Sequence, residues 1–392
     1  MKKILIISPY FPYPPRDGGK VRLYNLIKYL AKTNDVYLLA YIEPEASMDS
    51  VNLAKQVCKD VFPVIRDENK RIIRDDIPRS ASFFYTQAMI DELSRVMNLV
   101  KPDVVQLDFL IMTQYVNHIH NVPIFYTEHD MSVLDFKQSF HDRDLSETLR
   151  FIEWNKLVDY ERQIVEKFKS VIVLTQRDKQ LIEKFNPKVK ATIIPTGVDV
   201  DFFKPNDDIA DDYEQSLVFV GHYKHYPNAD AIMYFVNNIY DKVLRILPDI
   251  KLYIVGSGLT KDVENLAKIN KNIVITGEID DIRKYLKRPN IFIAPIRLGG
   301  GIKGKVLEAM AAGLPVIATN EAVDGIDHNM TEAVLSSDDA DIFADNIVKL
   351  VKDKKLYNTI SKNARIIVEK NYDWKIIAQT LNNFYSDKLN KL

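Results

Sequence analysis

The sequence predicts an α/β protein with two doubly wound, parallel-sheet domains that face each other across a cleft. Along most of the 392 residues, short runs rich in β-branched and aromatic residues alternate with longer amphipathic segments. Strands that are separated by helix-length segments pair in parallel and are covered by helices on both faces. The chain is also too long for one ordinary core, and the alternation occurs twice, so we expect two domains.

The expected strands of the first half are KILIIS, VYLLAY, DVVQLD, PIFYTE, VIVLT and ATIIPT. Those of the second half are SLVFVG, KLYIVG, NIVITG, NIFIAP and PVIAT. Between them, apolar residues recur at three- and four-residue steps, as in VRLYNLIKYLAK and LSETLRFIEWNKLVDYERQIVEKF, and this spacing predicts helices.

A polar, acidic segment, KPNDDIADDYEQ, separates the two series. We therefore expect a first domain over residues 1–203 and a second domain over residues 204–372. The last segment, 373–392, has helical periodicity and lies beyond the final expected strand. It either caps the second domain or packs back onto the first.

Composition and charge exclude several classes of protein. The content is 46% hydrophobic and 27% charged, as in soluble globular proteins, and the net charge of -1 provides no basic field for nucleic acid. The single cysteine, Cys58, fits a reducing compartment. The opening MKKILIISPYF resembles a signal peptide, but its apolar run is short and Pro9 interrupts it, so we expect a first strand. No stretch reaches the roughly 20 apolar residues of a membrane span. These features predict a cytoplasmic protein.

The residues after the strand NIFIAP form the strongest candidate site. Ligands of doubly wound sheets bind beyond the carboxyl ends of strands, where helix N-termini point. Gly299, Gly300 and Gly301 allow the backbone to approach a ligand closely. A helix is expected from near Lys303 to Gly313, where a proline two residues later prevents its continuation.

The same stretch carries an unusual set of positive charges. Lysines at a helix N-terminus oppose the helix dipole, so Arg297, Lys303 and Lys305 favour a multiply charged anion bound there. The alternative is a solvated basic turn. The spacing in GGGIKGKV also matches a nucleotide-binding P-loop, but Val306 stands where a magnesium-binding hydroxyl is required, which argues against an NTPase.

Glu308 is the only charged residue between Val306 and Asn320. A carboxylate on a mostly buried helix requires partners. It complements the helix dipole, or it accepts a hydrogen bond from a sugar hydroxyl, as acidic residues do in dinucleotide-binding folds. Its place one turn beyond a phosphate loop favours the sugar hydroxyl.

The stretch from Leu217 to Ile326 resembles the donor-binding domain of the retaining, GT-B-fold glycosyltransferase family 4, the glycosyl transferases group 1. The residues that carry the resemblance are FVGHYKHYPNADAI, YIVGSG, VITGEIDDI, APIRLGGGIKGKVLEAMAAGLPVIAT and GIDH. Weaker similarity is found in KILIISPYFPYPPRDGGKVRLYNLIKYLAK and IIPTGVDVDFFKP. The resemblance implies two Rossmann-like domains and a nucleotide-diphosphate sugar as donor substrate.

The resemblance also assigns roles to residues. Glu308 matches the glutamate that binds the nucleotide ribose, and the three cations would hold the diphosphate. The family commonly has a second glutamate where Gly300 stands here, so backbone amides of the glycine loop would replace it near the donor sugar. The backbone expected at the nucleotide base comprises Gly277, Glu278 and Ile279. Gly221 and His222, with Lys224 nearby, occupy the region where many members carry an arginine and a lysine.

In the first domain, two places deserve a functional interpretation. Gly18 and Gly19 open a helix after a proline-rich loop and are either a place for a phosphate or sugar, or a plain loop. His129, with Glu128 before it, follows the strand PIFYT at its carboxyl end. In the family a histidine at such a position lies beside the donor sugar. Two nearby acidic residues are interpreted as caps or solvated loop residues: Asp108 and Asp130.

The resemblance predicts sugar transfer to a glycan or lipid-linked acceptor in surface polysaccharide or glycoconjugate synthesis. We expect transfer that retains configuration and needs no metal or other cofactor, since the cations and a helix N-terminus can stabilise the departing diphosphate. Alternatives are a sugar-nucleotide epimerase or hydrolase of the same fold, or a non-catalytic sugar-nucleotide-binding subunit, which the substitution at Gly300 motivates.

Peripheral contact with a membrane is a further hypothesis, with a solvated basic face as its alternative. The basic residues considered for it are Arg16, Lys20, Arg22, Lys28, Arg71, Arg74 and Arg79.

Overall fold

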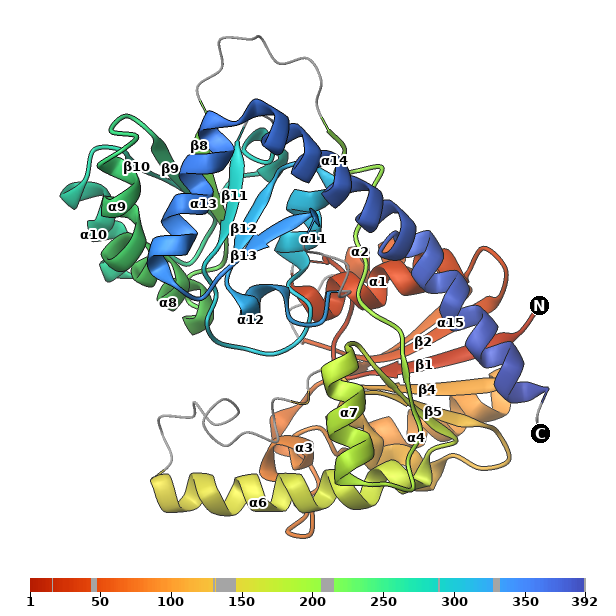
Figure 1. The fold of residues 1–392 in the computed structure, drawn as a ribbon. Helices are drawn as coiled ribbons and strands as arrows, with labels where there is room; N and C mark the ends of the chain where they lie inside the picture. Colours follow the sequence, from red (N-terminus) through yellow and green to blue (C-terminus); the bar gives the residue numbers. More distant parts are fainter. Residues whose placement is uncertain are drawn as a thin grey trace. The chain divides into compact units, whose positions relative to one another are not determined.

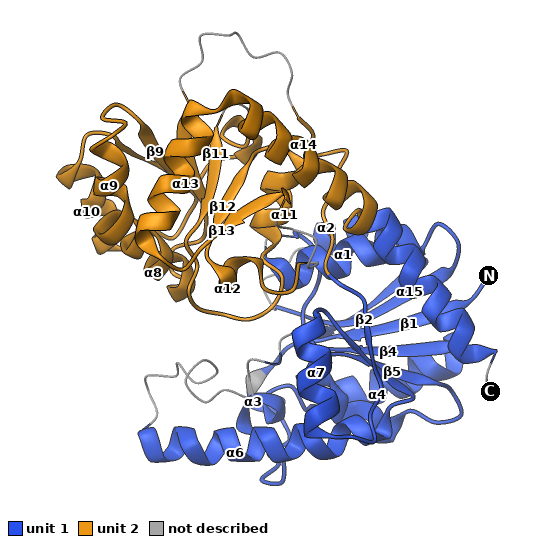
Figure 2. Ribbon diagram, viewed as in Figure 1, with its two compact units in different colours: residues 1–195, 374–392 blue, residues 196–373 orange. Residues whose placement is uncertain are grey.

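The computed structural model describes residues 1–15, 17–43, 48–129, 131, 146–205, 215–287, 290–326 and 332–390. The chain forms two compact units (Figure 2): Met1–Pro195 together with Trp374–Leu392, and Thr196–Asp373. Each unit contains one parallel sheet with helices packed against it (Figure 1), which confirms the predicted α/β class. Arg16, Asp130 and residues 327–328 of the GIDH stretch lie outside the described residues.

Unit 1 has a seven-stranded sheet of order β3-β2-β1-β4-β5-β6-β7, with all neighbouring strands parallel. The strands are β1 (Lys3–Ser8), β2 (Asp35–Ile42), β3 (Asp60–Ile65), β4 (Val104–Asp108), β5 (Ile124–Thr127), β6 (Ser170–Val173) and β7 (Ala191–Ile193). Successive residues of β1 alternate between two hydrophobic clusters, because side chains of a strand point to opposite faces. Burial on both faces explains why this strand is a continuous apolar run.

The longer helices of unit 1 are α1 (Gly18–Leu30), α2 (Met48–Lys55), α4 (Gln87–Val100), α6 (Glu147–Ile164), α7 (Gln176–Phe185) and α15 (Trp374–Leu389). Its shorter helical turns are η1 (Glu68–Lys70), α3 (Arg79–Ser82), η2 (Leu110–His118) and η4 (Val165–Lys167). One hydrophobic cluster includes residues of α1 and α15, and the other includes residues of α4 and η2.

Unit 2 has a six-stranded parallel sheet of order β10-β9-β8-β11-β12-β13. Its strands are β8 (Ser216–Val220), β9 (Lys251–Val255), β10 (Ile273–Gly277), β11 (Ile291–Ala294), β12 (Val316–Ala318) and β13 (Val334–Ser336). Its helices are α8 (Tyr226–Phe235), the π-helix η5 (Val236–Tyr240), α9 (Asp241–Leu244), α10 (Lys261–Ile269), η6 (Ile282–Lys284), α11 (Gly304–Ala311), α12 (Asn320–Val323), α13 (Ala340–Lys352) and α14 (Lys354–Asn371).

Strands β3 and β13 are absent from the sequence expectation. β3 reads DVFPVI, and a proline inside a run argues against a strand unless the strand lies at an edge, as β3 does. β13 has three residues, which is too short for a recognisable alternation.

The chain passes from unit 1 to unit 2 between residues 195 and 196, which differs from the expected domain boundary at 203/204. Residues 196–203 belong to unit 2, where Val198 forms a β-bridge with Asp373. The guanidinium of Arg365 donates to the carbonyl oxygens of Val200 and Phe203 at 3.0 and 2.7 Å. Backbone pairing therefore attaches this segment to unit 2 before the acidic stretch begins.

The C-terminal helix α15 belongs to unit 1, where it packs against α1. Trp374, Leu381 and Tyr385 of α15 are almost completely buried. The Lys2 ammonium donates to the Asn382 side-chain oxygen at 2.9 Å. The sequence left open whether this segment caps the second domain or packs back onto the first, and in the structure it packs on the first.

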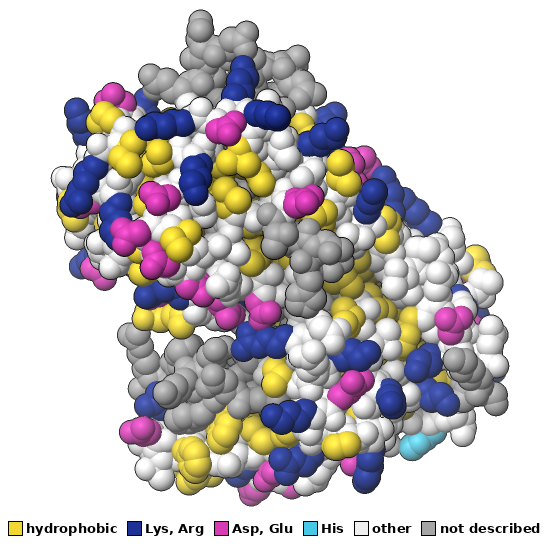
Figure 3. Space-filling model, viewed as in Figure 1, with side chains coloured by type: hydrophobic (Ala, Val, Ile, Leu, Met, Phe, Trp, Pro, Cys, Tyr) yellow, Lys and Arg dark blue, Asp and Glu magenta, His cyan; other side chains and the backbone are white. Residues whose placement is uncertain are grey.

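The basic residues considered for membrane contact do not form one exposed set. Arg22 is 2% exposed, and its guanidinium donates to the carbonyl oxygens of Ile194 and Pro195, so its assignment to a surface is wrong. Arg74 is paired with Asp76. On the face in view, positive and negative side chains are interspersed (Figure 3). Among the described residues, no helix combines the length and hydropathy needed to cross a bilayer.

Candidate functional site

The glycine loop of unit 2 follows β11 and leads into the first turn of α11. Gly299 and Gly301 have φ angles of 90° and 71°, in the left-handed region that favours glycine. α11 begins at Gly304, and Lys303 precedes it as an N-cap residue whose side chain makes no capping hydrogen bond. The loop and the helix N-terminus thus stand beyond the carboxyl end of β11, as expected.

Lys303 closes this loop. Its ammonium donates to the carbonyl oxygens of Gly299, Gly300 and Gly301 at 2.6, 2.8 and 3.0 Å. An ammonium group has three donor hydrogens, which matches these three bonds. Lys303 therefore shapes the loop directly and brings its positive charge to the glycine backbone.

Lys305 lies one residue inside α11 and is partly buried. Its Nζ donates to the side-chain oxygen of Asn228 at 2.6 Å and stands 4.9 Å from the centre of the Phe219 ring. Removal from water lowers the pKa of Lys305 to about 7; Glu308 opposes this decrease and Lys303 adds to it. The ammonium form of Lys305 is therefore only partly hydrated in the folded protein, and a bound anion would stabilise it.

Glu308 lies one helical turn farther along α11 and is also partly buried. No described residue donates a hydrogen bond to its carboxylate or forms an ion pair with it. Burial raises the pKa of Glu308 to about 7, and the positive charge of Lys305 opposes this increase. A partly buried carboxylate without a donor is suited to accept hydrogen bonds from a ligand.

Arg297 is held on the side of α8. Its guanidinium makes a bidentate ion pair with Asp230, with N–O distances of 3.1 and 2.7 Å, and lies over the Tyr234 ring at 4.2 Å. A bidentate pair of this kind is among the stronger polar contacts. The charge of Arg297 is thus balanced by the Asp230 carboxylate, a pairing that no sequence pattern indicates.

In the sheet, β8 is the neighbour of β11, and β9 and β10 follow outward from β8 in that order. Gly277 ends β10 with a φ of 68°, and its carbonyl oxygen accepts a hydrogen bond from the Gly256 amide at 3.2 Å. After it, Glu278 is exposed and Ile279 is partly buried. The contact expected here with a nucleotide base stays a prediction.

Gly221 and His222 follow β8 directly. A Cβ at Gly256 would lie 2.0 Å from the Gly221 carbonyl oxygen, so the ends of β8 and β9 approach each other more closely than side chains permit. The His222 side chain is exposed and bonds through Nδ1 to the Ser257 hydroxyl at 3.0 Å.

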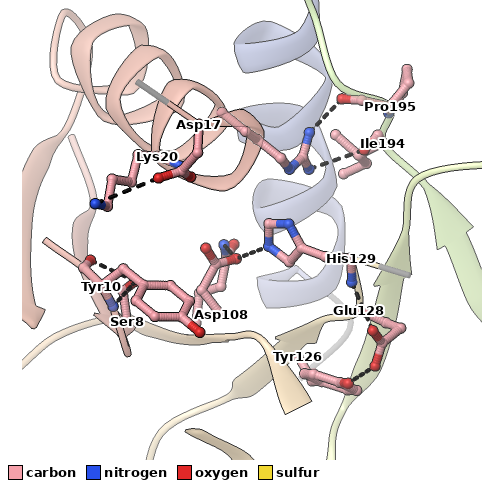
Figure 4. Close-up of polar contacts among 12 residues, drawn as sticks. Ser8, Tyr10, Asp17, Lys20, Asp108, Tyr126, Glu128, His129, Ile194 and Pro195 are labelled. Atoms are coloured by element: carbon pink, nitrogen blue, oxygen red, sulfur yellow. Dashed lines mark hydrogen bonds and ion pairs between the residues drawn. The ribbon is translucent and has the colours of Figure 1, made fainter. Parts of the chain in front are cut away.

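In unit 1, His129 pairs with Asp108 (Figure 4). The distance from His129 Nε2 to Asp108 Oδ1 is 3.1 Å, and the ring stacks on Phe109 with centroids 3.7 Å apart. Asp108 is 2% exposed at the end of β4, so its interpretation as a cap or a solvated loop residue is wrong. It adjoins His129 because β4 and β5 are neighbours whose carboxyl ends meet at one edge of the sheet.

Glu128 points away from this pair (Figure 4). Its carboxylate accepts hydrogen bonds from the Tyr126 hydroxyl and from the His129 backbone amide, the latter at 2.9 Å. Glu128 is 5% exposed. Its contacts fix the backbone that carries His129.

The glycine pair at the start of α1 has two different environments. Asp17 caps the helix by accepting from the Lys20 amide at 3.0 Å. A Cβ at Gly19 would lie 2.7 Å from Cζ of Phe109, whereas a Cβ at Gly18 would meet nothing within 4 Å. Gly19 therefore allows α1 to approach the ring on which His129 stacks.

No group of three or more His, Cys, Asp or Glu side chains that could hold a metal ion occurs within the described ranges.

Comparison with known families decides between the functions left open by the sequence. The family described as "Glycosyl transferases group 1" matches residues 214–353, and "Glycosyltransferase Family 4" matches residues 16–202. The chain belongs to the group 1, family 4 glycosyltransferases. The resemblance found in the sequence is therefore confirmed, and the protein is an enzyme of the hexosyltransferase type that uses a nucleotide-sugar donor and a saccharide acceptor.

Individual relatives of this glycosyltransferase differ in coverage. An uncharacterised 44.6 kDa protein in the cps region of Klebsiella pneumoniae is 24% identical over 97% of the chain and 99% of that protein. The Escherichia coli UDP-Gal:alpha-D-GlcNAc-diphosphoundecaprenol alpha-1,3-galactosyltransferase is 28% identical over 50% of the chain and 54% of that protein.

Among solved structures, sucrose-phosphate synthase from Thermosynechococcus elongatus superimposes with a TM-score of 0.76 over 100% of both chains at 18% identity. Anabaena HepE in complex with UDP gives 0.68 over 98% of this chain and 100% of that chain at 14% identity. Both likenesses show the fold.

The glycosyltransferase thus brings together Lys303, Lys305 and Glu308 around one helix N-terminus in unit 2. The sequence did not single out the polar residues that contact the predicted cations of this site: Asn228, which accepts a hydrogen bond from Lys305, and Asp230, which pairs with Arg297. Both lie in the α8 segment, and neither occurs in a spacing that indicates its partner. The sheet order provides the signal that was missing, since it places β8 next to β11.

Proposed function

We propose that this glycosyltransferase binds the diphosphate of its nucleotide-sugar donor at the glycine loop and the N-terminus of α11. The observation that carries the proposal is the pair of Lys305 and Glu308, a partly buried cation and a partly buried carboxylate one turn apart. The cation is bonded to a neutral amide, and the carboxylate has no hydrogen-bond donor among the described residues. A diphosphate and a ribose hydroxyl supply the two groups that this pair requires.

The reaction needs stabilisation of the diphosphate as it leaves the sugar. Negative charge grows on the phosphate oxygens while the bond breaks, and preorganised cations and helix amides lower the energy of that state. Lys305 serves as the direct cation, and Lys303 adds charge while it holds the loop. Arg297 joins them when the phosphate competes with Asp230 for its guanidinium. In this account the transfer needs no metal and retains the configuration of the sugar.

The remaining donor contacts follow from the same arrangement. Glu308 accepts the ribose hydroxyls, and the backbone of Gly277, Glu278 and Ile279 meets the base. Amides of the glycine loop contact the sugar in place of the carboxylate that Gly300 lacks. Within unit 1 we assign His129 a role in sugar binding, with its ring orientation fixed by Asp108 and Phe109.

For the acceptor we propose a saccharide carried by a lipid diphosphate or a growing surface glycan. The support is the Escherichia coli relative, whose name specifies a diphosphoundecaprenol-linked acceptor, and the capsular polysaccharide glycosyltransferase CapM of Staphylococcus aureus, 30% identical over 35% of the chain.

The test uses UDP-, GDP- and ADP-sugars, first as a thermal-shift panel and then in transfer to a lipid-linked saccharide with and without EDTA. A donor that binds the folded state raises its melting temperature. We expect Lys305→Ala and Glu308→Ala to reduce transfer by about 100-fold or more, and EDTA to have no effect. Wild-type turnover and donor affinity in both variants would show that the site lies elsewhere. Tight donor binding without transfer to the lipid-linked saccharide would show that the proposed acceptor is wrong.

A further inference from the structure

Asn228 connects α11 to the chain that follows β8. It lies in the first turns of α8 and is 9% exposed. Its side-chain oxygen accepts from Lys305 Nζ at 2.6 Å, and its side-chain nitrogen donates to the His222 carbonyl oxygen at 2.9 Å. Both polar ends of one amide are therefore used to join two segments of unit 2.

The surroundings of this amide are tightly packed. A Cβ at Gly221 would come within 3.2 Å of the Asn228 side chain. The His222 ring is held by the Ser257 hydroxyl, and a Cβ at Gly258 would lie 2.5 Å from that ring. Gly221 thus leaves room for the Asn228 side chain beside the end of β8, where its two hydrogen bonds set its orientation.

The chemical type of this residue matters as much as its position. An amide oxygen orients an ammonium group and leaves its positive charge available to an anion, whereas a carboxylate in the same place would neutralise it. We propose that Asn228 is a positioning residue that holds the Lys305 ammonium at the N-terminus of α11, with its charge intact for the donor diphosphate. This inference rests on the function proposed for Lys305.

Other titratable groups near Lys305 also affect its pKa. Lys303 and Glu308 come from its own segment and act on it in opposite directions. Asp230 on α8 is engaged by Arg297. The remaining titratable side chains of the β8–α8 segment are His222, Tyr223, Lys224, His225, Tyr226 and Tyr234.

The experiment compares Asn228→Asp and Asn228→Ala with a control, Asn238→Asp. Asn238 is an exposed asparagine whose side-chain nitrogen also donates to a backbone carbonyl, that of Tyr234 at 3.0 Å, so the control makes the same substitution away from Lys305. The titration of Lys305 is followed without ligand, by competitive acetylation and peptide mass spectrometry on the full chain. Melting temperatures establish that each variant is folded.

We expect Asn228→Asp to raise the midpoint of the Lys305 titration by one unit or more, because a nearby anion stabilises the ammonium. Asn228→Ala removes an acceptor and should not raise it, and Asn238→Asp should leave it unchanged. Calorimetry with UDP, GDP and ADP at pH 6, where Lys305 is mostly charged, should show about tenfold weaker binding for both Asn228 variants. In Asn228→Asp the new carboxylate competes with the diphosphate for the Lys305 ammonium. In Asn228→Ala nothing holds that ammonium in position.

An unshifted Lys305 midpoint in folded Asn228→Asp would overturn the role of Asn228, and so would wild-type affinity in Asn228→Ala. If the role of Asn228 were purely structural, nucleotide binding would weaken in both Asn228 variants, but the Lys305 midpoint in Asn228→Asp would keep its wild-type value. Failure of the wild type to bind any of the three nucleotides is a different result: it overturns the proposed function, whereas the midpoint shift still tests the contact itself.

Discussion

At the scale of single residues, the donor-binding role proposed for Glu308 comes with a cost in stability. Its carboxylate is withdrawn from water on α11 and has no hydrogen-bond donor among the described residues, so the folded state disfavours its ionised form. Burial raises the pKa of Glu308 to about 7, above its usual value of 4.5. The folded protein therefore binds more protons than the unfolded chain between these two values, and stability falls as the pH rises through that range.

Glu308→Gln should consequently stabilise the free enzyme at pH 8. A neutral amide of the same size removes the buried negative charge, and we expect a gain of about 1 kcal/mol, equivalent to a melting temperature roughly 2–4 °C higher. At pH 4.5 the wild-type carboxyl is mostly protonated in the folded state, so the difference should become small. Thermal unfolding at both pH values measures this, and a variant less stable than wild type at pH 8 would contradict the unfavourable removal of this carboxylate from water.

At the scale of elements, the sequence was informative where a pattern is local. Alternation of strands and helices predicted both sheets, and glycines followed by lysines marked the N-terminus of α11. The contacts that complete the site are not local. Asn228 reaches Lys305, and Asp108 reaches His129, because β8 lies beside β11 and β4 lies beside β5. Strand order of this kind is decided by tertiary packing, which a single sequence does not display.

The start of α1 offers a matched pair of substitutions for the His129 site. Gly19→Ala places a methyl group against Phe109 and should displace the ring on which His129 stacks, whereas Gly18→Ala meets no atom within 4 Å. Alanine itself favours a helix over glycine by about 1 kcal/mol.

We therefore expect Gly18→Ala to keep wild-type transfer and Gly19→Ala to lose about 10-fold in kcat/KM, of the size that small misplacements cost. Melting curves show whether both proteins remain folded. Equal activity of the two variants would mean that the Phe109–His129 stack does not contribute to the reaction.

At the scale of the whole molecule, the residues proposed for function divide between two units that are folded around separate cores. Unit 2 contains the glycine loop, Lys305, Glu308 and Asn228, and unit 1 contains His129 with Asp108. The chain passes from one unit to the other at residues 195–196 and returns at 373–374, where α15 completes the core of unit 1. Each unit can thus be assigned its own share of substrate recognition.

The most direct test of the central claim is hydrogen–deuterium exchange of the full chain with and without the nucleoside diphosphate of the preferred donor. A ligand held by backbone amides and a helix N-terminus slows exchange of those amides. We expect protection in peptides covering residues 296–312, 219–230 and 275–280, with little change at the β12–β13 end of unit 2. Protection confined to unit 1, or absent from residues 299–308 under saturating nucleotide, would contradict the donor site described for this glycosyltransferase.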